Sequence, residues 1–275
     1  MAEAVLEVSH LTITYPAGGR TIVDDLSFSV LAGEAVALVG ESGSGKTTAS
    51  LAIMGLPPDG LRKTAGSVRL LGEDITDLSQ EGYRKLRNVK MGMVMQNPIS
   101  CFDPVFSIWS HFKETLKSHQ SVTKDEIREK AVLALSEAGF ERPENVLELY
   151  PFQMSGGMLQ RVMLAITLVL SPPLVIADEA TTDLDVPSQA VILRLLNERR
   201  QERGLSLLII THDLSVAAAM ASKIVFLENG HLIEIGEAKT IFSNPASTGA
   251  SKLLALHRDL YTDRYMKVTK NLTQI

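Results

Sequence analysis

The sequence predicts an α/β protein built around a parallel β-sheet that is buried on both faces. Runs of aliphatic residues within 34–40, 173–179 and 205–213 have the length of strands and show no polar alternation. Helical segments separate these runs, and this alternation is typical of a parallel sheet covered by helices. A glycine-rich loop lies between the first run and the helix that follows it.

The other elements follow in chain order from their patterns. The segment 121–140 begins at a Ser/Thr cap and ends at Gly139, and Arg199, Arg200 and Arg203 occupy the last turn of 187–203 before Gly204. Strands are predicted at 4–14, 21–31, 34–40, 66–75 (one arm of a hairpin), 88–96, 173–179 and 205–213. Helices are predicted at 46–55, 108–140, 155–170 and 187–203.

Composition narrows the class of protein. The chain has 275 residues, of which 45% are hydrophobic and 21% charged, which is an ordinary globular composition. Its formal net charge of -5 argues against nucleic acid as the main partner. Cys101 is the one cysteine, so no intrachain disulfide forms. The most apolar tract, 162–177, contains two prolines and is shorter than the roughly 20 residues of a spanning helix. We expect no membrane crossing.

The loop GESGSGKTT matches the phosphate-binding pattern G-x-x-x-x-G-K-[ST]. Its glycines allow successive backbone N–H groups to surround an anion, and the following helix adds its positive end. The lysine supplies charge to terminal phosphates, and the first threonine hydroxyl can bind Mg²⁺. The residues expected to contact nucleotide are Gly40, Glu41, Ser42, Gly43, Ser44, Gly45, Lys46, Thr47 and Thr48.

Two neighbouring acids end the apolar run at 174–177. Asp178 and Glu179 therefore emerge at the carboxyl end of a buried strand, where open parallel sheets bind ligands. Asp178 is suited to hold Mg²⁺, and Glu179 to polarise an attacking water. Acids that merely cap the next helix would give the same pattern. A second glycine pair, in MSGGMLQR at 154–161, opens a helix and forms another potential anion site.

Together these motifs resemble the nucleotide-binding subunits of ABC transporters, over about residues 4–240. The LSGGQ signature of that family stands here as MSGGM, with Met154 and Met158 in its first and last places, and Ala180 replaces the proline common after the glutamate. The resemblance implies a P-loop NTPase of the ABC ATPase fold. That fold has a RecA-like parallel-sheet core, an antiparallel β subdomain and a helical subdomain. We expect the ATPase domain at 1–240, its helical subdomain at about 97–160, and a C-terminal extension at 241–275 without a cysteine cluster.

The resemblance also implies roles for particular residues. Tyr15 is similar to the aromatic residue that stacks on adenine, and Gln96 to the Q-loop glutamine that reaches Mg²⁺. His212 resembles the switch histidine that contacts the γ-phosphate, and Asp183 and Asp185 lie in the D-loop at the subunit contact. The implied catalytic residues are Glu179, His212 and Gln96. The implied metal ligands are Thr47, Gln96 and Asp178, and the implied signature contacts are Ser155, Gly156 and Gly157.

The family mechanism implies the cofactors ATP and Mg²⁺ and a site shared between two subunits. The expected partners are a second, homologous ATPase subunit, two transmembrane permease subunits and an external substrate-binding protein. The chain is expected at the cytoplasmic face of the inner membrane, attached through the permeases. The stretch 97–108 is the expected docking segment, although Phe102 and Phe106 within it and Trp109 directly after it could equally be core residues.

The cargo is the least constrained expectation. MQNPISCFDP, YPFQMSGGMLQR and ADEATTDLD resemble the importer branch for oligopeptides, dipeptides and nickel, and SGGMLQR with TTDLDV favours the nickel members. A peptide importer is the alternative. A soluble ABC ATPase of translation or DNA repair, or a regulator not coupled to transport, is the alternative of another class. The tail FSNPASTGASKLL departs from the branch, which usually has a proline-tyrosine-threonine turn there.

Overall fold

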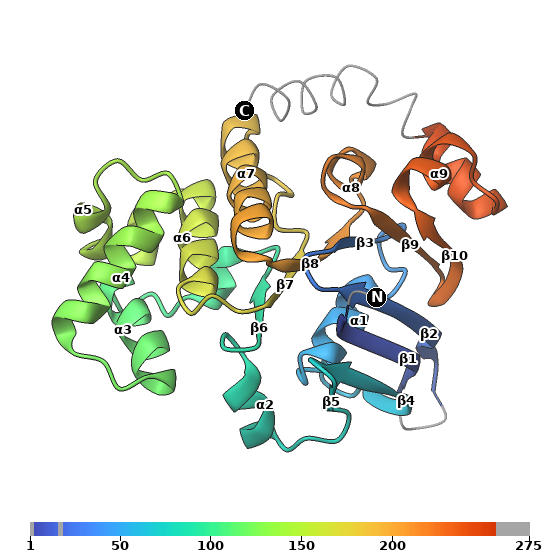
Figure 1. Ribbon diagram of the computed structural model, residues 1–275, viewed down its shortest axis with the longest axis horizontal. Helices are drawn as coiled ribbons and strands as arrows, with labels where there is room; N and C mark the ends of the chain where they lie inside the picture. The colour runs from blue at the N-terminus through green and yellow to red at the C-terminus, as the bar shows by residue number, and fades with distance from the viewer. Residues whose placement is uncertain (1–2, 16–18, 257–275) are drawn as a thin grey trace.

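The computed structural model describes residues 3–15 and 19–256. Figure 1 shows a mixed sheet with a group of helices standing to one side of it. Within the described residues the sheet has ten strands, in the order β5-β4-β1-β2-β10-β9-β3-β8-β7-β6. The expected α/β fold class is confirmed, with an antiparallel and a parallel part in the same sheet.

The parallel part of the sheet contains the aliphatic runs of the sequence. β3 pairs in parallel with both β8 and β9, and β7 pairs in parallel with β8 and β6. All side chains of β3, β7 and β8 are buried, because helices or further strands cover both faces. The strands of this part are β3 (Ala35–Val39), β6 (Met91–Val94), β7 (Leu174–Asp178), β8 (Ser206–Thr211) and β9 (Lys223–Glu228).

The antiparallel part is built from the N-terminal strands. β1 pairs with both β2 and β4, and β4 turns into the short β5 through Leu71 and Gly72, which both have positive φ. The hairpin expected around 66–75 is therefore present. The strands of this part are β1 (Ala4–Thr14), β2 (Thr21–Leu31), β4 (Arg62–Leu70) and β5 (Glu73–Asp74).

A hairpin that the sequence analysis did not anticipate joins the two parts. β10 (His231–Glu237) pairs antiparallel with β9 and meets β2 at a single parallel position. Asn229 and Gly230 form its turn with φ values of 49° and 85°, the left-handed conformations that an Asn-Gly hairpin turn requires. The Asn-Gly pair between two apolar runs was the signal for this hairpin.

The described residues contain nine α-helices that end within them, besides the helical segment 248–256, and four of the nine were not anticipated. α2, α5, α8 and α9 have seven residues or fewer, too few to establish a helical period. The expected helix 108–140 is two helices, because Thr123 and Glu126 form a capping box that begins α4 anew. The helices are α1 (Lys46–Ile53), α2 (Gln80–Leu86), α3 (Ile108–His119), α4 (Lys124–Glu137), α5 (Pro143–Leu147), α6 (Gly156–Leu168), α7 (Val186–Arg203), α8 (Leu214–Met220) and α9 (Ala238–Ser243).

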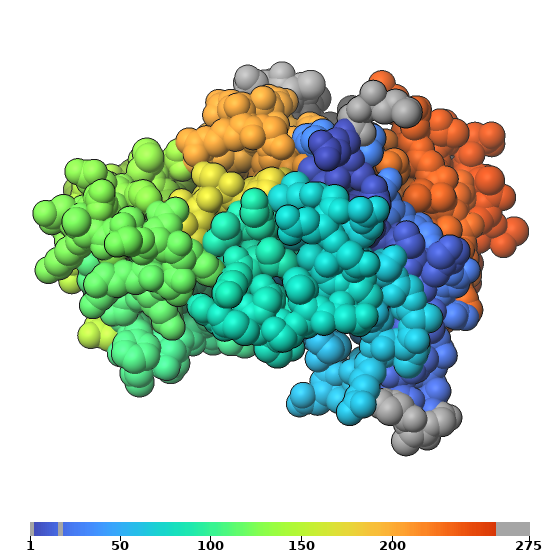
Figure 2. Space-filling model, turned by 60° about the horizontal axis from the view of Figure 1, so that its bottom comes forward, coloured from blue at the N-terminus to red at the C-terminus, as the bar shows by residue number. Residues whose placement is uncertain are grey.

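The helices α3, α4 and α5 lie on the far side of α6 from the sheet (Figure 1). Figure 2 shows the teal segment that includes α2 between these green helices and the blue antiparallel strands. An ion pair between Arg199 on α7 and Glu137 on α4 joins the helical group to the sheet part. Arg161 on α6 adds a hydrogen bond of 2.8 Å to the Ala138 carbonyl and stacks over the Phe140 ring.

The chain after β10 packs back on the sheet part. The Glu234 carboxylate accepts hydrogen bonds from the backbone N–H groups of Ala246 and Ser247, at 2.9 and 2.8 Å. Residues 248–256 are helical and bury Ala250 and Leu254. The rest of the expected extension, 257–275, lies outside the described residues. No helix within 3–15 and 19–256 has both the length and the apolar character needed to span a bilayer.

Candidate nucleotide site

The glycine loop links the end of β3 to the start of α1, as the sequence predicts. A Cβ atom on Gly40 would overlap the carbonyl oxygen of Leu227 on β9, so only glycine fits there. Gly45 has φ 102° and faces the Ile22 carbonyl, while Gly43 has φ 80° and open space around it. The loop glycines are therefore required by the protein's own packing and backbone conformation, in addition to the close approach of an anion.

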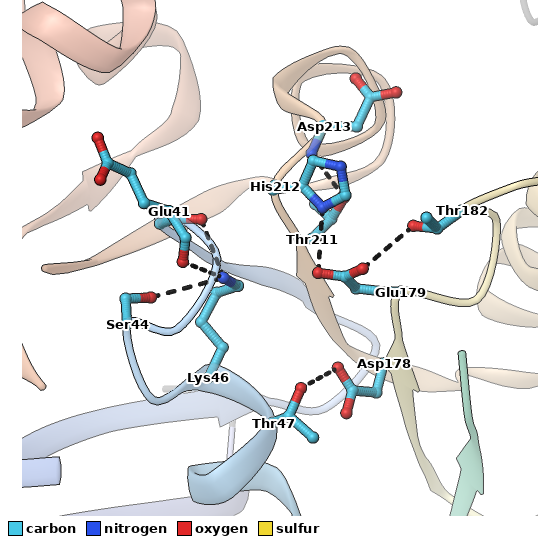
Figure 3. A network of polar contacts seen from close by, with 11 residues as sticks. Glu41, Ser44, Lys46, Thr47, Asp178, Glu179, Thr182, Thr211, His212 and Asp213 are labelled. Atoms are coloured by element: carbon cyan, nitrogen blue, oxygen red, sulfur yellow. Dashed lines mark hydrogen bonds and ion pairs between the residues drawn. The ribbon is translucent and has the colours of Figure 1, made fainter. Parts of the chain in front are cut away.

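Lys46 places its ammonium group inside this loop (Figure 3). Its Nζ donates to the carbonyls of Gly40 and Glu41, at 2.9 and 2.8 Å, and lies 3.5 Å from Ser44 Oγ. Burial lowers the pKa of the Lys46 amine, and the negative charges of Glu179 and Asp178 oppose this shift. The loop thus holds a buried cation next to its backbone N–H groups, an arrangement that suits a bound phosphate.

Thr47 and Asp178 meet at the carboxyl end of β7. Thr47 Oγ1 donates to Asp178 Oδ1 at 3.1 Å, and Ser50 Oγ lies 3.4 Å from Oδ2. Burial raises the pKa of the Asp178 carboxyl, against the opposing effect of these hydrogen bonds. Ser50, which the motif reading missed, lies on α1 one turn after Thr47 and faces the same carboxylate.

These groups form a donor set that fits Mg²⁺. The ion prefers hard oxygen ligands and takes one or two from the protein, with waters and phosphate oxygens completing the rest. A hydroxyl and a carboxylate at hydrogen-bond distance supply such oxygens. Among the described residues no cluster of three or more His, Cys, Asp or Glu could hold a metal alone, so the site would depend on phosphate oxygens.

Glu179 and His212 face each other across the ends of β7 and β8 (Figure 3). His212 Nδ1 lies 3.0 Å from Glu179 Oε1, and Thr182 Oγ1 lies 3.4 Å from Oε2. Glu179 has φ 46°, an unusual conformation for a residue with a side chain, and its N–H donates to the Ile210 carbonyl at 2.8 Å. This backbone turn directs the carboxylate away from Asp178. Thr182 was not identified from the sequence.

The signature segment begins α6. Ser155 is the N-cap of α6, and its Oγ accepts a hydrogen bond of 3.3 Å from the Met158 N–H. Gly156 has open space where a Cβ would stand, whereas a Cβ on Gly157 would crowd Ser188 on α7. Gly156 lines an open groove with Gln96, Asn97, Pro98, Thr182, Asp183 and Leu184.

This groove brings three of the predicted motifs together. It combines Gln96 after β6, Gly156 at the start of α6 and Asp183 in the turn before α7. Gln96 is exposed there. Asp185 caps α7 by accepting a hydrogen bond from the Ser188 N–H. The predicted residues thus fall into two groups. Lys46, Thr47, Asp178, Glu179 and His212 form the loop cluster, and Gln96, Gly156 and Asp183 line the groove.

Tyr15 stands at the end of β1, with 44% of its surface exposed. Its ring lies beside Gly60, close enough that a Cβ there would approach within 3.5 Å. The exposed ring is available for stacking on a flat ligand. Residues 16–18, which complete the expected turn, lie outside the described residues.

The stretch after Gln96 is partly core and partly surface. Phe102 is buried and Trp109 packs against the core, so these two do not form an exposed surface. The Ile108 N–H donates to the Leu149 carbonyl at 2.9 Å, which places this stretch beside the segment that precedes α6. The exposed apolar side chains of the two segments, called here the apolar patch, are Ile99, Val105, Phe106, Tyr150 and Phe152.

Comparison with known proteins agrees with this arrangement. Residues 23–182 match the family model of the ABC transporter. The chain is 39% identical to the dipeptide transport ATP-binding protein DppD of Escherichia coli K12, over 91% of this chain and 77% of the relative. It is 41% identical to the oligopeptide transport ATP-binding protein AppD of Bacillus subtilis 168, over 88% of this chain and 74% of the relative.

A solved structure is similar over most of the chain. It is the dimeric ATP-binding cassette MJ0796 in a post-hydrolysis state bound to ADP and Pi. The TM-score is 0.76 at 27% identity, and the match covers 85% of this chain and 98% of that one.

Because the Asp178 carboxylate is buried, we expect it to lower the stability of the folded chain by an amount that depends on pH. Because its pKa is raised in the folded chain, its contribution is most favourable below its ordinary value of 3.8 and is lost as pH rises through the folded value. Asp178→Asn keeps an oxygen that can accept from Thr47. Without nucleotide or metal, this variant should have a higher Tm than the parent at about pH 8, and the difference should shrink as pH falls towards about 4.

Asp185→Asn is the matched control, because hydrogen bonds from Ser188 lower the pKa of the Asp185 carboxyl. Its contribution to stability is present above the ordinary pKa and is lost as pH falls. The Tm difference for Asp185→Asn should therefore have the opposite pH dependence. An Asp178→Asn variant that is no more stable than the parent at about pH 8 would contradict the account of Asp178.

Proposed function

Because the chain belongs to the ABC transporter family, we propose that it is the ATP-hydrolysing subunit of a membrane importer whose cargo is a dipeptide or oligopeptide. The observation that carries the ATPase assignment is the convergence of Lys46, Asp178 and Glu179 at the carboxyl ends of β3 and β7. A buried cation, a hydroxyl–carboxylate pair and a second, more accessible carboxylate are the parts that phosphoryl transfer to water requires.

ATP binds with its phosphates in the glycine loop. The N–H groups of Gly43 to Thr48 and the Lys46 ammonium provide the positive charge, and the ammonium exchanges loop carbonyls for phosphate oxygens. Tyr15 provides an aromatic face for the adenine base. Thr47 and Asp178 would hold Mg²⁺, and the ion would neutralise charge on the transferring group. Gln96 is the proposed further oxygen donor.

Glu179 acts as the general base for the attacking water. The water oxygen bonds to the terminal phosphorus while its proton passes to the Glu179 carboxylate, and the bond from that phosphorus to the ADP oxygen breaks. His212 and Thr182 contact the two carboxylate oxygens and hold them in one orientation. His212 lies at the end of β8, next to the expected position of the γ-phosphate.

The nucleotide site is completed by a second, homologous subunit. Ser155, Gly156 and Gly157 lie at the start of α6 beside the open groove, and they act on a nucleotide held by the partner. The groove with Gln96 and Asp183 faces that partner. The dimeric arrangement of the similar ATP-binding cassette supports this reading.

The apolar patch is the docking surface for the permease subunits. Phe152 is 73% exposed and stacks on Tyr150, and Val105 is 70% exposed on the neighbouring segment. Exposed apolar clusters of this kind mark protein–protein contacts. Ile99 of the patch follows Gln96 by three residues, so movement of a bound permease can reach the nucleotide site through this segment. This contact would hold the chain at the cytoplasmic face of the membrane, with an external binding protein delivering cargo.

The proposed cargo, a peptide, differs from nickel, which the sequence motifs favoured. The motif reading favoured nickel, whereas the relatives reported above are dipeptide and oligopeptide transport proteins. These names support the peptide alternative. A soluble ATPase or a regulator is disfavoured, because the chain carries both a complete loop cluster and an exposed apolar patch.

The roles assigned to Lys46 and Glu179 predict that one variant loses ATP binding and the other loses ATP hydrolysis. Glu179→Gln should keep ATP binding and reduce kcat of the assembled complex by about 100-fold or more, because the amide cannot accept the proton. Lys46→Ala should weaken ATP binding itself, because it removes the buried cation. Binding is measured with a fluorescent ATP analogue and turnover by phosphate release. Glu198→Gln, a change at a partly exposed position on α7, is the control. Turnover of Glu179→Gln at the parent rate would refute the role of Glu179.

The peptide assignment is tested by uptake in source cells that lack this chain. Labelled di- and oligopeptide uptake should be lost while nickel uptake continues, and the parent chain should restore it. The Glu179→Gln chain should not restore it, because transport requires turnover. Loss of nickel uptake with peptide uptake unchanged would return the assignment to nickel and leave the ATPase mechanism intact.

A further inference from the structure

Gln160 occupies a buried junction that the mechanism above does not use. It lies one turn into α6, after Gly156, and its surface is 1% exposed. Its Nε2 donates two hydrogen bonds, both of 2.9 Å, to the carbonyls of Met95 and Ala180. One side-chain amide therefore ties α6 to the main chain at two points that are far apart in sequence.

Both points adjoin residues with proposed roles in hydrolysis. Met95 directly precedes Gln96, and Ala180 directly follows Glu179. The start of α6 carries Ser155 and Gly156, which belong to the face turned towards the partner's nucleotide. The amide of Gln160 thus connects two regions. One is the start of α6, which acts on the partner's nucleotide, and the other contains Gln96 and Glu179, which act on the chain's own nucleotide.

The orientation of this amide follows from its partners. Both are carbonyl oxygens, which only accept hydrogen bonds, so the NH₂ group must face them. Gln160 Oε1 is then buried, and it has no hydrogen-bond partner among the described residues. An orphaned buried acceptor is unfavourable for folding, whereas the two donated hydrogen bonds satisfy the Met95 and Ala180 carbonyls.

We propose that Gln160 is a positioning residue for ATP hydrolysis, which couples the start of α6 to the peptides beside Gln96 and Glu179. The inference rests on the proposed function. When the start of α6 engages the partner's nucleotide, the two hydrogen bonds hold the Met95 and Ala180 peptides in the positions that aim Gln96 and Glu179. Each nucleotide site thus becomes able to hydrolyse ATP when its subunit is docked on the partner subunit.

A second hydrogen bond between α6 and β6 provides a matched control. Thr167, two turns further along α6, is also buried, and its Oγ1 lies 3.2 Å from the Met93 carbonyl and 2.9 Å from the Met163 carbonyl within α6. It joins the same helix to the same strand but adjoins neither Gln96 nor Glu179. Thr167→Val removes both contacts of the hydroxyl with little change of shape, and so measures the effect of loosening the contact between α6 and β6 together with one bond inside α6.

The test compares Gln160→Met with Thr167→Val in the assembled transporter. Gln160→Met should leave the ATP affinity and KM within about twofold, because the Lys46 loop is untouched, and should lower kcat at least about tenfold. Its Tm should fall, because the Met95 and Ala180 carbonyls lose their donor although one orphaned oxygen is removed. Thr167→Val should keep kcat within about twofold of the parent.

The outcomes separate this inference from the proposed function. Parent-like kcat in Gln160→Met, or an equal loss in both variants, would overturn the positioning role while the ATPase assignment stands. A parent complex without ATP hydrolysis would overturn both. If Gln160→Met does not fold, the glutamine is structural and the proposal is wrong, unless Gln160→Leu folds and shows the same selective loss of kcat.

Discussion

The arrangement of the site depends on the parallel register of β3, β7, β8 and β9. Val39 at the end of β3 lies opposite Thr211 of β8 and Phe226 of β9, and Asp178 at the end of β7 lies opposite Ile210. This register brings the glycine loop, the two acids and His212 to one edge of the sheet. It also places the Leu227 carbonyl against Gly40, so the strand that supports the loop excludes any larger residue from its first position.

The same edge holds features that do not favour folding. Lys46 and Asp178 are charged groups whose pKa values are shifted by burial, and Glu179 has a backbone conformation unusual for a residue with a side chain. Gln160 adds an orphaned buried oxygen. Proteins retain such local costs where activity requires them. Their concentration around β7 and the start of α6 is consistent with a site that is completed by phosphates, Mg²⁺ and a second subunit.

The sequence was informative wherever a local pattern determines structure. β1, β2 and β3 lie where their apolar runs predicted, and the glycine loop follows β3 as the motif requires. Helices of seven residues or fewer, such as α2 and α8, carry too little periodicity to be identified. The junction at Gln160 could not be predicted, because its partners are backbone carbonyls supplied by the fold. The sequence motifs favoured nickel over peptides, whereas the known relatives are peptide transport proteins. These motifs could not identify the cargo, because no residue of the nucleotide site is expected to touch it.

The central claim is that one chain carries two halves of different nucleotide sites. The direct measurement is ATP turnover per chain as the isolated chain is assembled with its partner ATPase and permease subunits, or concentrated towards self-association. The account predicts that dilute monomer is nearly inactive and that turnover rises steeply with the fraction in the assembled state. A dilute monomer with the turnover of the full complex would contradict it, because Lys46, Glu179 and His212 would then suffice without a signature segment from another subunit.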